Sequence, residues 1–179
     1  MNIFDALQVL GAWDRSGRYV FTKGDLRKLF SDDAPKAFDE GLRRLVGKGV
    51  LMRACRGVYV NEQARSFDRF VLERIARALR RGEYSYVSLE SMLSEYGVIS
   101  QVPVDRLTIM TTGRKGVFKT PWGVLEFTHT KRTPADILEH TISDRERPLR
   151  VATKQTAWED LVRVGRNIEM VDREELDAD

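Results

Sequence analysis

Hydrophobic positions along the first fifty residues recur with helical spacing, interrupted once by a strand-like run. They predict a helix over residues 2–13, a short strand at residues 19–21 and two further helices. Thr22 is a suitable N-cap for the second helix, with Asp25 as the acidic member of a capping box. Pro35 suits the first turn of the third helix, where its missing N–H has no partner to lose. The apolar face of that third helix is formed by Phe38, Leu42, Leu45 and Val46.

A β-hairpin is predicted directly after the third helix. Residues 50–54 and 58–60 are strand-like, and Arg56-Gly57 between them is typical of a turn. Helix, short strand, helix, turn, helix and hairpin within sixty residues predict a winged helix-turn-helix.

The rest of the chain mixes helical and strand-like patterns and predicts a small mixed α/β domain. The pattern over residues 66–81 is the clearest helix, and it has three open roles: to brace the winged domain, to begin the next domain, or to extend a basic surface. We therefore expect an α+β chain with domains at residues 1–62 and 63–179, the second ending in an acidic, frayed tail from Asp172. Further strands are expected at 84–87, 106–112, 116–120 and 123–130, and helices after Ser88, Pro134 and Thr153 or Gln155.

Composition limits the classes of protein that this chain can belong to. No stretch approaches the roughly 18 apolar residues of a membrane span, and residues 1–5 lack the start of a signal peptide. A single cysteine, Cys55, excludes an intrachain disulfide, and with two histidines it argues against a structural zinc site. We therefore expect a cytoplasmic protein with no metal and no membrane partner.

The distribution of charge is uneven and suggests an anionic partner for the first half. Residues 1–82 contain 17 Lys and Arg against 10 Asp and Glu, whereas residues 83–179 contain 13 against 17. A basic surface attracts phosphates, since counterions are released on binding. Because the major groove of B-DNA is about 12 Å wide and accepts one α-helix, the third helix is the candidate recognition helix. The candidate DNA-binding residues are Lys23, Lys36, Arg43, Arg44, Lys48, Arg53 and Arg56.

Sequence alone leaves open which arginine contacts bases and which contacts phosphates. Motifs that would indicate catalysis or a cofactor are missing: no Walker A sequence, no G-x-G-x-x-G and no nucleophile elbow. We therefore expect no catalytic residues, no cofactor and no enzymatic activity, although catalytic groups can converge from distant positions.

Residues 41–60 resemble the helix-and-wing region of AbiEi-family antitoxins from type IV toxin–antitoxin systems. Blocks at residues 84–99, 111–114 and 127–131 resemble the shorter members of that family, so the resemblance covers roughly residues 5–165. It implies an N-terminal winged helix that binds inverted repeats in its own promoter and represses the operon. It also implies a C-terminal domain that counters a nucleotidyltransferase-like toxin, and possible homodimers on DNA. The second domain is shorter than in better-known members, which weakens the toxin part of the analogy.

The sequence is also consistent with two other functions, from different classes of protein. A stand-alone transcription factor would sense a small molecule in its second domain, in a pocket lined by Tyr84, Tyr86 and Trp122. An enzyme acting on nucleic acid would use the winged helix only to deliver its substrate. A bound metabolite would favour the first of these, and metal-dependent turnover of labelled nucleic acid the second.

Overall fold

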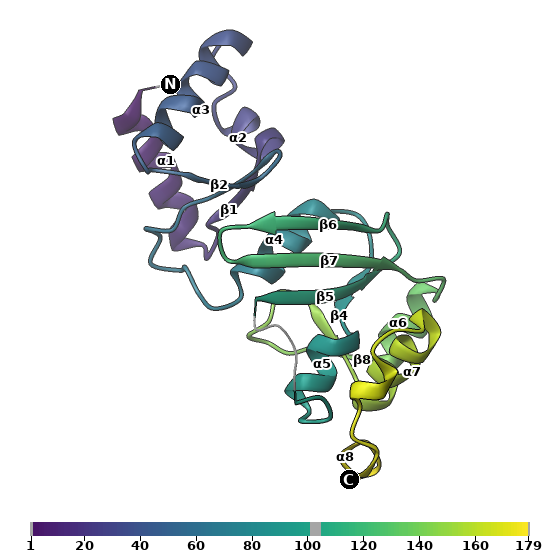
Figure 1. Ribbon diagram of the computed structural model, residues 1–179. Helices are drawn as coiled ribbons and strands as arrows, with labels where there is room; N and C mark the ends of the chain where they lie inside the picture. The colour runs from purple at the N-terminus through teal and green to yellow at the C-terminus, as the bar shows by residue number, and fades with distance from the viewer. Residues whose placement is uncertain (1, 101–104, 179) are drawn as a thin grey trace. The chain divides into compact units, whose positions relative to one another are not determined.

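The computed structural model describes residues 2–100 and 105–178 and divides the chain into two compact units. Unit 1 comprises Met1–Leu79 and unit 2 comprises Arg80–Asp179. Unit 1 is helical around a small sheet, and unit 2 is built on a larger one (Figure 1). Among the described residues, every helix is too short or too polar to cross a bilayer.

Unit 1 contains four helices and a three-stranded sheet. The sheet is antiparallel with β3 in the centre, in the order β1-β3-β2, and Val20 of β1 pairs with Val60 of β3. Three helices precede the hairpin, as in the predicted winged helix-turn-helix, and a fourth helix follows it. The elements in chain order are α1 Ile3–Arg15, β1 Val20–Thr22, α2 Lys23–Leu29, α3 Pro35–Gly47, β2 Met52–Cys55, β3 Val58–Val60 and α4 Val71–Leu79.

Local sequence sets the start of each helix in the helix-turn-helix. The Thr22 hydroxyl accepts a hydrogen bond from the Asp25 backbone N–H at 3.0 Å, and the Asp25 carboxylate accepts one from the Thr22 N–H at 2.9 Å. This confirms the predicted capping box, which satisfies two N–H groups that a helix start leaves unpaired. Pro35 is the first residue of α3, as predicted.

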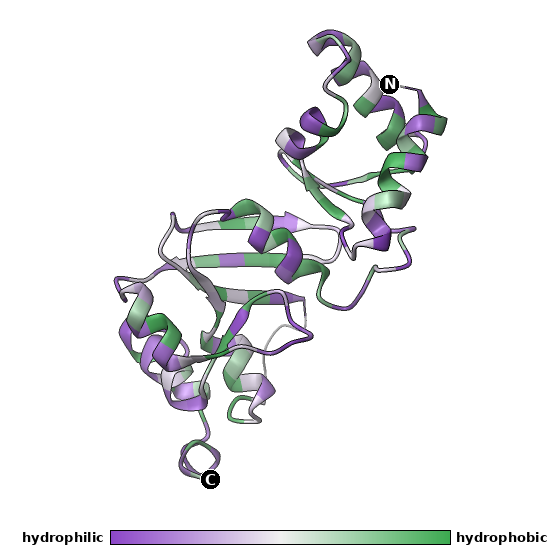
Figure 2. Cartoon of the chain, turned by 180° about the vertical axis from the view of Figure 1, so that it is seen from behind, coloured by the Kyte–Doolittle hydropathy of each residue, from purple (hydrophilic) through white to green (hydrophobic). Residues whose placement is uncertain are grey.

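One hydrophobic core holds the three N-terminal helices on the sheet. Each helix carries both hydrophobic and hydrophilic residues (Figure 2). The hydrophobic ones recur at helical spacing and so form an apolar face toward this core. Burying a leucine or phenylalanine side chain contributes roughly 1.5–3 kcal/mol to the stability of the fold. The buried members are Ala6, Leu10, Phe21, Leu26, Phe38, Leu42, Leu45, Leu51 and Tyr59.

The division between units lies after Leu79, later in the chain than the predicted boundary at residue 62. The connection after β3 is held to α1, because Asp14 accepts hydrogen bonds from the backbone N–H groups of Arg65 and Ser66, both at 2.9 Å. The following helix, α4, then packs against β1 and β3. Of the three roles left open for this helix, packing against the winged domain is the one observed, and it is shorter than predicted.

Unit 2 is a six-stranded mixed sheet with helices around it. The strand order is β6-β7-β5-β4-β9-β8, with β5 parallel to β7 and β4 parallel to β9. Helix α5 packs on β5 and α7, and α7 packs on β9. Its elements are β4 Ser85–Val87, α5 Leu89–Glu95, β5 Arg106–Thr111, β6 Gly116–Thr120, β7 Gly123–His129, α6 Pro134–His140, β8 Thr141–Ile142, β9 Arg150–Ala152, α7 Lys154–Val164, the 3₁₀ helix η1 Ile168–Met170 and α8 Arg173–Asp177.

The α+β fold class is confirmed, and two local predictions in unit 2 are corrected. Strands β8 and β9 were not predicted, because runs this short carry no alternating pattern and no tight turn joins them, unlike Arg56-Gly57 between β2 and β3. The tail was expected to fray, yet α8 forms there: Asp172 caps it and Leu176 is buried. Lys154 also donates hydrogen bonds to the carbonyls of Glu175 and Ala178.

Candidate nucleic-acid interface

Helix α3 lies with one face on the core and the other in solvent. Phe38, Leu42 and Leu45 are buried on its inner face. Its outer face carries exposed polar side chains because residues three and four apart share a face of a helix. These exposed polar residues are Lys36, Glu40, Arg43 and Arg44.

The β2–β3 hairpin, hereafter the wing, runs beside α2 and ends in a tight turn. Gly57 at the turn has φ +79°, a left-handed conformation that side chains rarely adopt. Its carbonyl accepts a hydrogen bond from the Lys23 backbone N–H at 2.8 Å, which ties the wing to the start of α2. The register shifts between Arg53 and Cys55, so β2 contains a bulge next to the turn.

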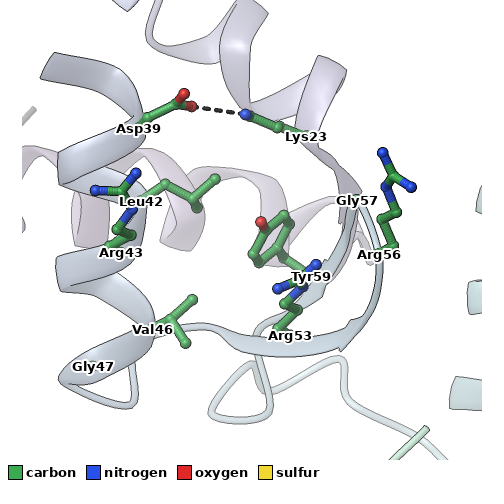
Figure 3. A pocket seen from close by; sticks show the side chains of 10 residues that line it. All are labelled: Lys23, Asp39, Leu42, Arg43, Val46, Gly47, Arg53, Arg56, Gly57 and Tyr59. Carbon is green, nitrogen blue, oxygen red and sulfur yellow. Dashed lines mark ion pairs between the residues drawn. The ribbon is translucent and has the colours of Figure 1, made fainter. Parts of the chain in front are cut away.

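Between α3 and the wing lies a groove of about 670 Å³ with an apolar floor. Leu42 and Val46 point from α3 toward Tyr59 of β3, and the Arg53 side chain lies beside that ring (Figure 3). The complete lining is Lys23, Asp39, Leu42, Arg43, Val46, Gly47, Arg53, Arg56, Gly57 and Tyr59.

The groove is strongly positive, since four cationic side chains face a single carboxylate. That carboxylate belongs to Asp39, which lies 2.8 Å from the Lys23 ammonium group. The hydrogen bond from Lys23 holds the pKa of Asp39 below its usual value, so Asp39 is ionised at neutral pH. Arg53 donates a long hydrogen bond, 3.4 Å, to the Cys55 carbonyl of its own strand. A surface of this kind is suited to binding phosphates.

All seven predicted residues are exposed, but only some of them line the groove. Lys23, Arg43, Arg53 and Arg56 do so. Lys36 belongs to the first turn of α3, and Arg44 follows Arg43 on the same helix, about 100° further round its axis. Lys48 follows the last residue of α3 as its C-cap.

The side chains of two other basic residues of unit 1 are held by contacts within the domain. Arg18 lies 2.8 Å from Asp25 and over the rings of Trp13 and Phe21. Arg27 donates to the Asp33 carbonyl at 2.6 Å and lies over the Phe38 ring. Both side chains are part-buried.

Sequence reasoning missed the apolar floor of the groove. Leu42 and Val46 were predicted as core residues, and Tyr59 only as part of a strand. The residue pattern does not give this arrangement, because a regular turn at Arg56-Gly57 would pair Tyr59 with Ala54. The bulge in β2 shifts Tyr59 opposite Arg53, so both side chains lie on one face of the sheet.

A family model described as "Transcriptional regulator, AbiEi antitoxin" matches residues 8–61, which contain α2, α3 and the wing. Residues 8–61 are therefore similar to an AbiEi-type domain. The match confirms the resemblance for this segment. No curated protein sequence matches the chain.

The crystal structure of the Rv2827c protein from Mycobacterium tuberculosis resembles both the AbiEi-type domain and the part that follows it. The TM-score is 0.57 at 16% sequence identity, covering 98% of this chain and 71% of that one. At this identity the likeness concerns the fold alone.

The aromatic residues proposed for a ligand pocket have different environments in unit 2. Tyr86 is fully buried and its hydroxyl donates to Asp160 at 2.9 Å, as expected for a core residue. Tyr84 is 45% exposed, and Trp122 lies in the turn between β6 and β7, with β5 between β7 and β4. Within the described residues, no cluster of three or more His, Cys, Asp or Glu side chains is arranged to hold a metal ion.

Proposed function

We propose that this chain is a DNA-binding transcriptional autorepressor, acting on an inverted repeat in its own promoter. The observation that carries the proposal is the groove between α3 and the wing, where Lys23, Arg43, Arg53 and Arg56 gather within an AbiEi-type domain. In this proposal α3 enters the major groove, Arg43 reaches base edges and the wing arginines contact phosphates.

Lys36, Arg44 and Lys48 complete the proposed surface at the two ends and the outer face of α3. Their exposed cationic side chains add sequence-independent attraction for the duplex. A homodimer on the two halves of the repeat follows from the symmetry of such operators.

The direct test is a gel-shift titration of the full chain against its own upstream DNA, over a salt series. Specific binding should exceed binding to a scrambled duplex by about 10³-fold or more. Each phosphate contact should add about 0.9 to the slope of log affinity against log salt. Equal affinity for both duplexes, or no salt dependence, would contradict the proposal.

The second half of the proposal is that unit 2 counters a nucleotidyltransferase-like toxin encoded next to this chain, in keeping with the family of residues 8–61. It is tested by co-expression: the toxin alone should arrest growth, and unit 2 should be needed for growth to recover. Growth rescue by residues 1–79 alone would overturn this role for unit 2, while leaving the repressor proposal intact. We propose no catalytic function for either unit.

A further inference from the structure

Helix α3 carries two adjacent carboxylates that differ in how they are compensated. Asp39 is paired with Lys23 at 2.8 Å. Glu40 is exposed, and within residues 2–100 and 105–178 its carboxylate has neither an ion-pair nor a hydrogen-bond partner. The sequence around it contains cations one turn away in both directions, Lys36 and Arg43, yet it pairs with neither.

The position of Glu40 places it on the surface that would face DNA. It is the sixth residue of α3, and the neighbouring Phe38 and Gly41 are buried on the inner face. In helix-turn-helix proteins the N-terminal part of the recognition helix contacts base edges. Glu40 therefore lies among the base-contacting positions, if the proposed function holds.

A carboxylate at such a position is unfavourable for general DNA binding, since phosphates repel it. It becomes favourable only where the duplex donates a hydrogen bond. In the major groove the donors are the amino groups of cytosine N4 and adenine N6. Adenine offers an acceptor, N7, next to its donor, and a carboxylate has no proton for that acceptor. Cytosine offers the donor without this conflict.

We propose that Glu40 recognises a cytosine by accepting a hydrogen bond from its N4 amino group. This rests on the proposed function and adds a specificity-determining residue to it. Glu40 also acts by exclusion, because guanine O6 and N7 and thymine O4 present acceptors that repel a carboxylate at the same position. Affinity for random sequence is lowered while preference for the operator rises.

The test is selection from a random duplex library with the full chain and three variants, Glu40→Ala, Glu40→Gln and Asp32→Asn. The wild type should select cytosine at one position of each half-site. Glu40→Ala should lose that preference, roughly tenfold in relative affinity, and keep the others. Glu40→Gln should change the preferred base to adenine, since glutamine matches the donor and acceptor of adenine.

Asp32→Asn is the control for charge, since it removes one negative charge from an exposed residue that precedes α3 and lies outside the groove. It should leave base preference unchanged, because the effect of this charge on a duplex does not depend on sequence. The inference is overturned if Glu40→Ala and wild type select the same bases at every position. If the wild type selects no sequence at all, both the inference and the proposed function fail, so the two failures are distinguishable.

Discussion

The Lys23 ammonium group, at the start of α2, lies 2.8 Å from the Asp39 carboxylate in α3. This ion pair joins the two helices of the helix-turn-helix at the rim of the positive groove (Figure 3). Both side chains are about half exposed, so solvent screens their attraction. The pair therefore matters more for the charge of the groove than for the stability of unit 1.

Replacing Lys23 with Ala should leave the free energy of unfolding nearly unchanged and weaken binding to every duplex. The variant loses one cation and leaves Asp39 without its ion-pair partner next to phosphates. Adding Asp39→Ala should recover part of the affinity, and titrations of both variants over a salt series measure this. A large fall in the unfolding midpoint of Lys23→Ala would instead assign the pair a structural role.

Arg43 and Arg56 should respond differently to substitution, although both line the groove. Arg43→Ala should cost about 1–3 kcal/mol of operator binding and relax specificity at one base pair. Arg56→Ala, at the wing turn, should weaken all sequences alike and lower the salt slope by about one. Operator mutants titrated with each variant separate these effects. Unchanged affinity of the double variant would remove this surface from the proposal.

How much of this organisation the sequence predicts depends on how local its cause is. The Thr22–Asp25 capping box needs only residues three apart, and it was predicted correctly. The exposed face of α3 follows from helical periodicity alone. The Lys23–Asp39 pair could not be predicted, because it depends on how two helices pack. The same holds for the end of unit 1 after Leu79, which depends on the packing of α4 against β1 and β3.

Unit 1 should lose stability in acid through Asp68. Burial raises the pKa of this carboxyl, but hydrogen bonds from Arg74, Tyr19 and the Phe70 N–H outweigh it, so the pKa lies below its usual value of 3.8. A depressed pKa stabilises the fold fully above the unfolded value, and this contribution is lost as the pH falls through the folded value.

The measurement is urea unfolding of wild type and Asp68→Asn from pH 7 to pH 2. The wild type should be the more stable protein by a constant margin above about pH 5. That margin should shrink progressively as the pH falls below about 5 and through 3.8, the usual pKa of the group. Glu40→Gln is the control, because it removes an exposed carboxylate that has neither an ion-pair nor a hydrogen-bond partner within the described residues. A margin independent of pH would contradict this account.

Unit 2 should depend on the buried carboxylate of Asp160, which is fully inaccessible in α7. It accepts hydrogen bonds from the Tyr86 hydroxyl at 2.9 Å and the Ser88 hydroxyl at 2.8 Å, and a longer one from Arg132 at 3.4 Å. Burial raises the pKa of Tyr86, so its hydroxyl keeps the proton that it donates. Asp160→Ala leaves these three groups buried without their acceptor, and should cost about 3–5 kcal/mol.

Two further variants test the Tyr86 hydrogen bond and the second ion pair of Arg132 separately. Tyr86→Phe removes one donor and leaves the other two, so it should cost only about 1 kcal/mol. Glu159→Ala removes the other partner of Arg132, 3.1 Å away, but that carboxylate is 43% exposed and the cost should be small. Hydrogen exchange of the α7 and β4 amides reports unit 2 without reference to unit 1. Equal losses of protection in Asp160→Ala and Glu159→Ala would show that burial of Asp160 does not hold these elements together.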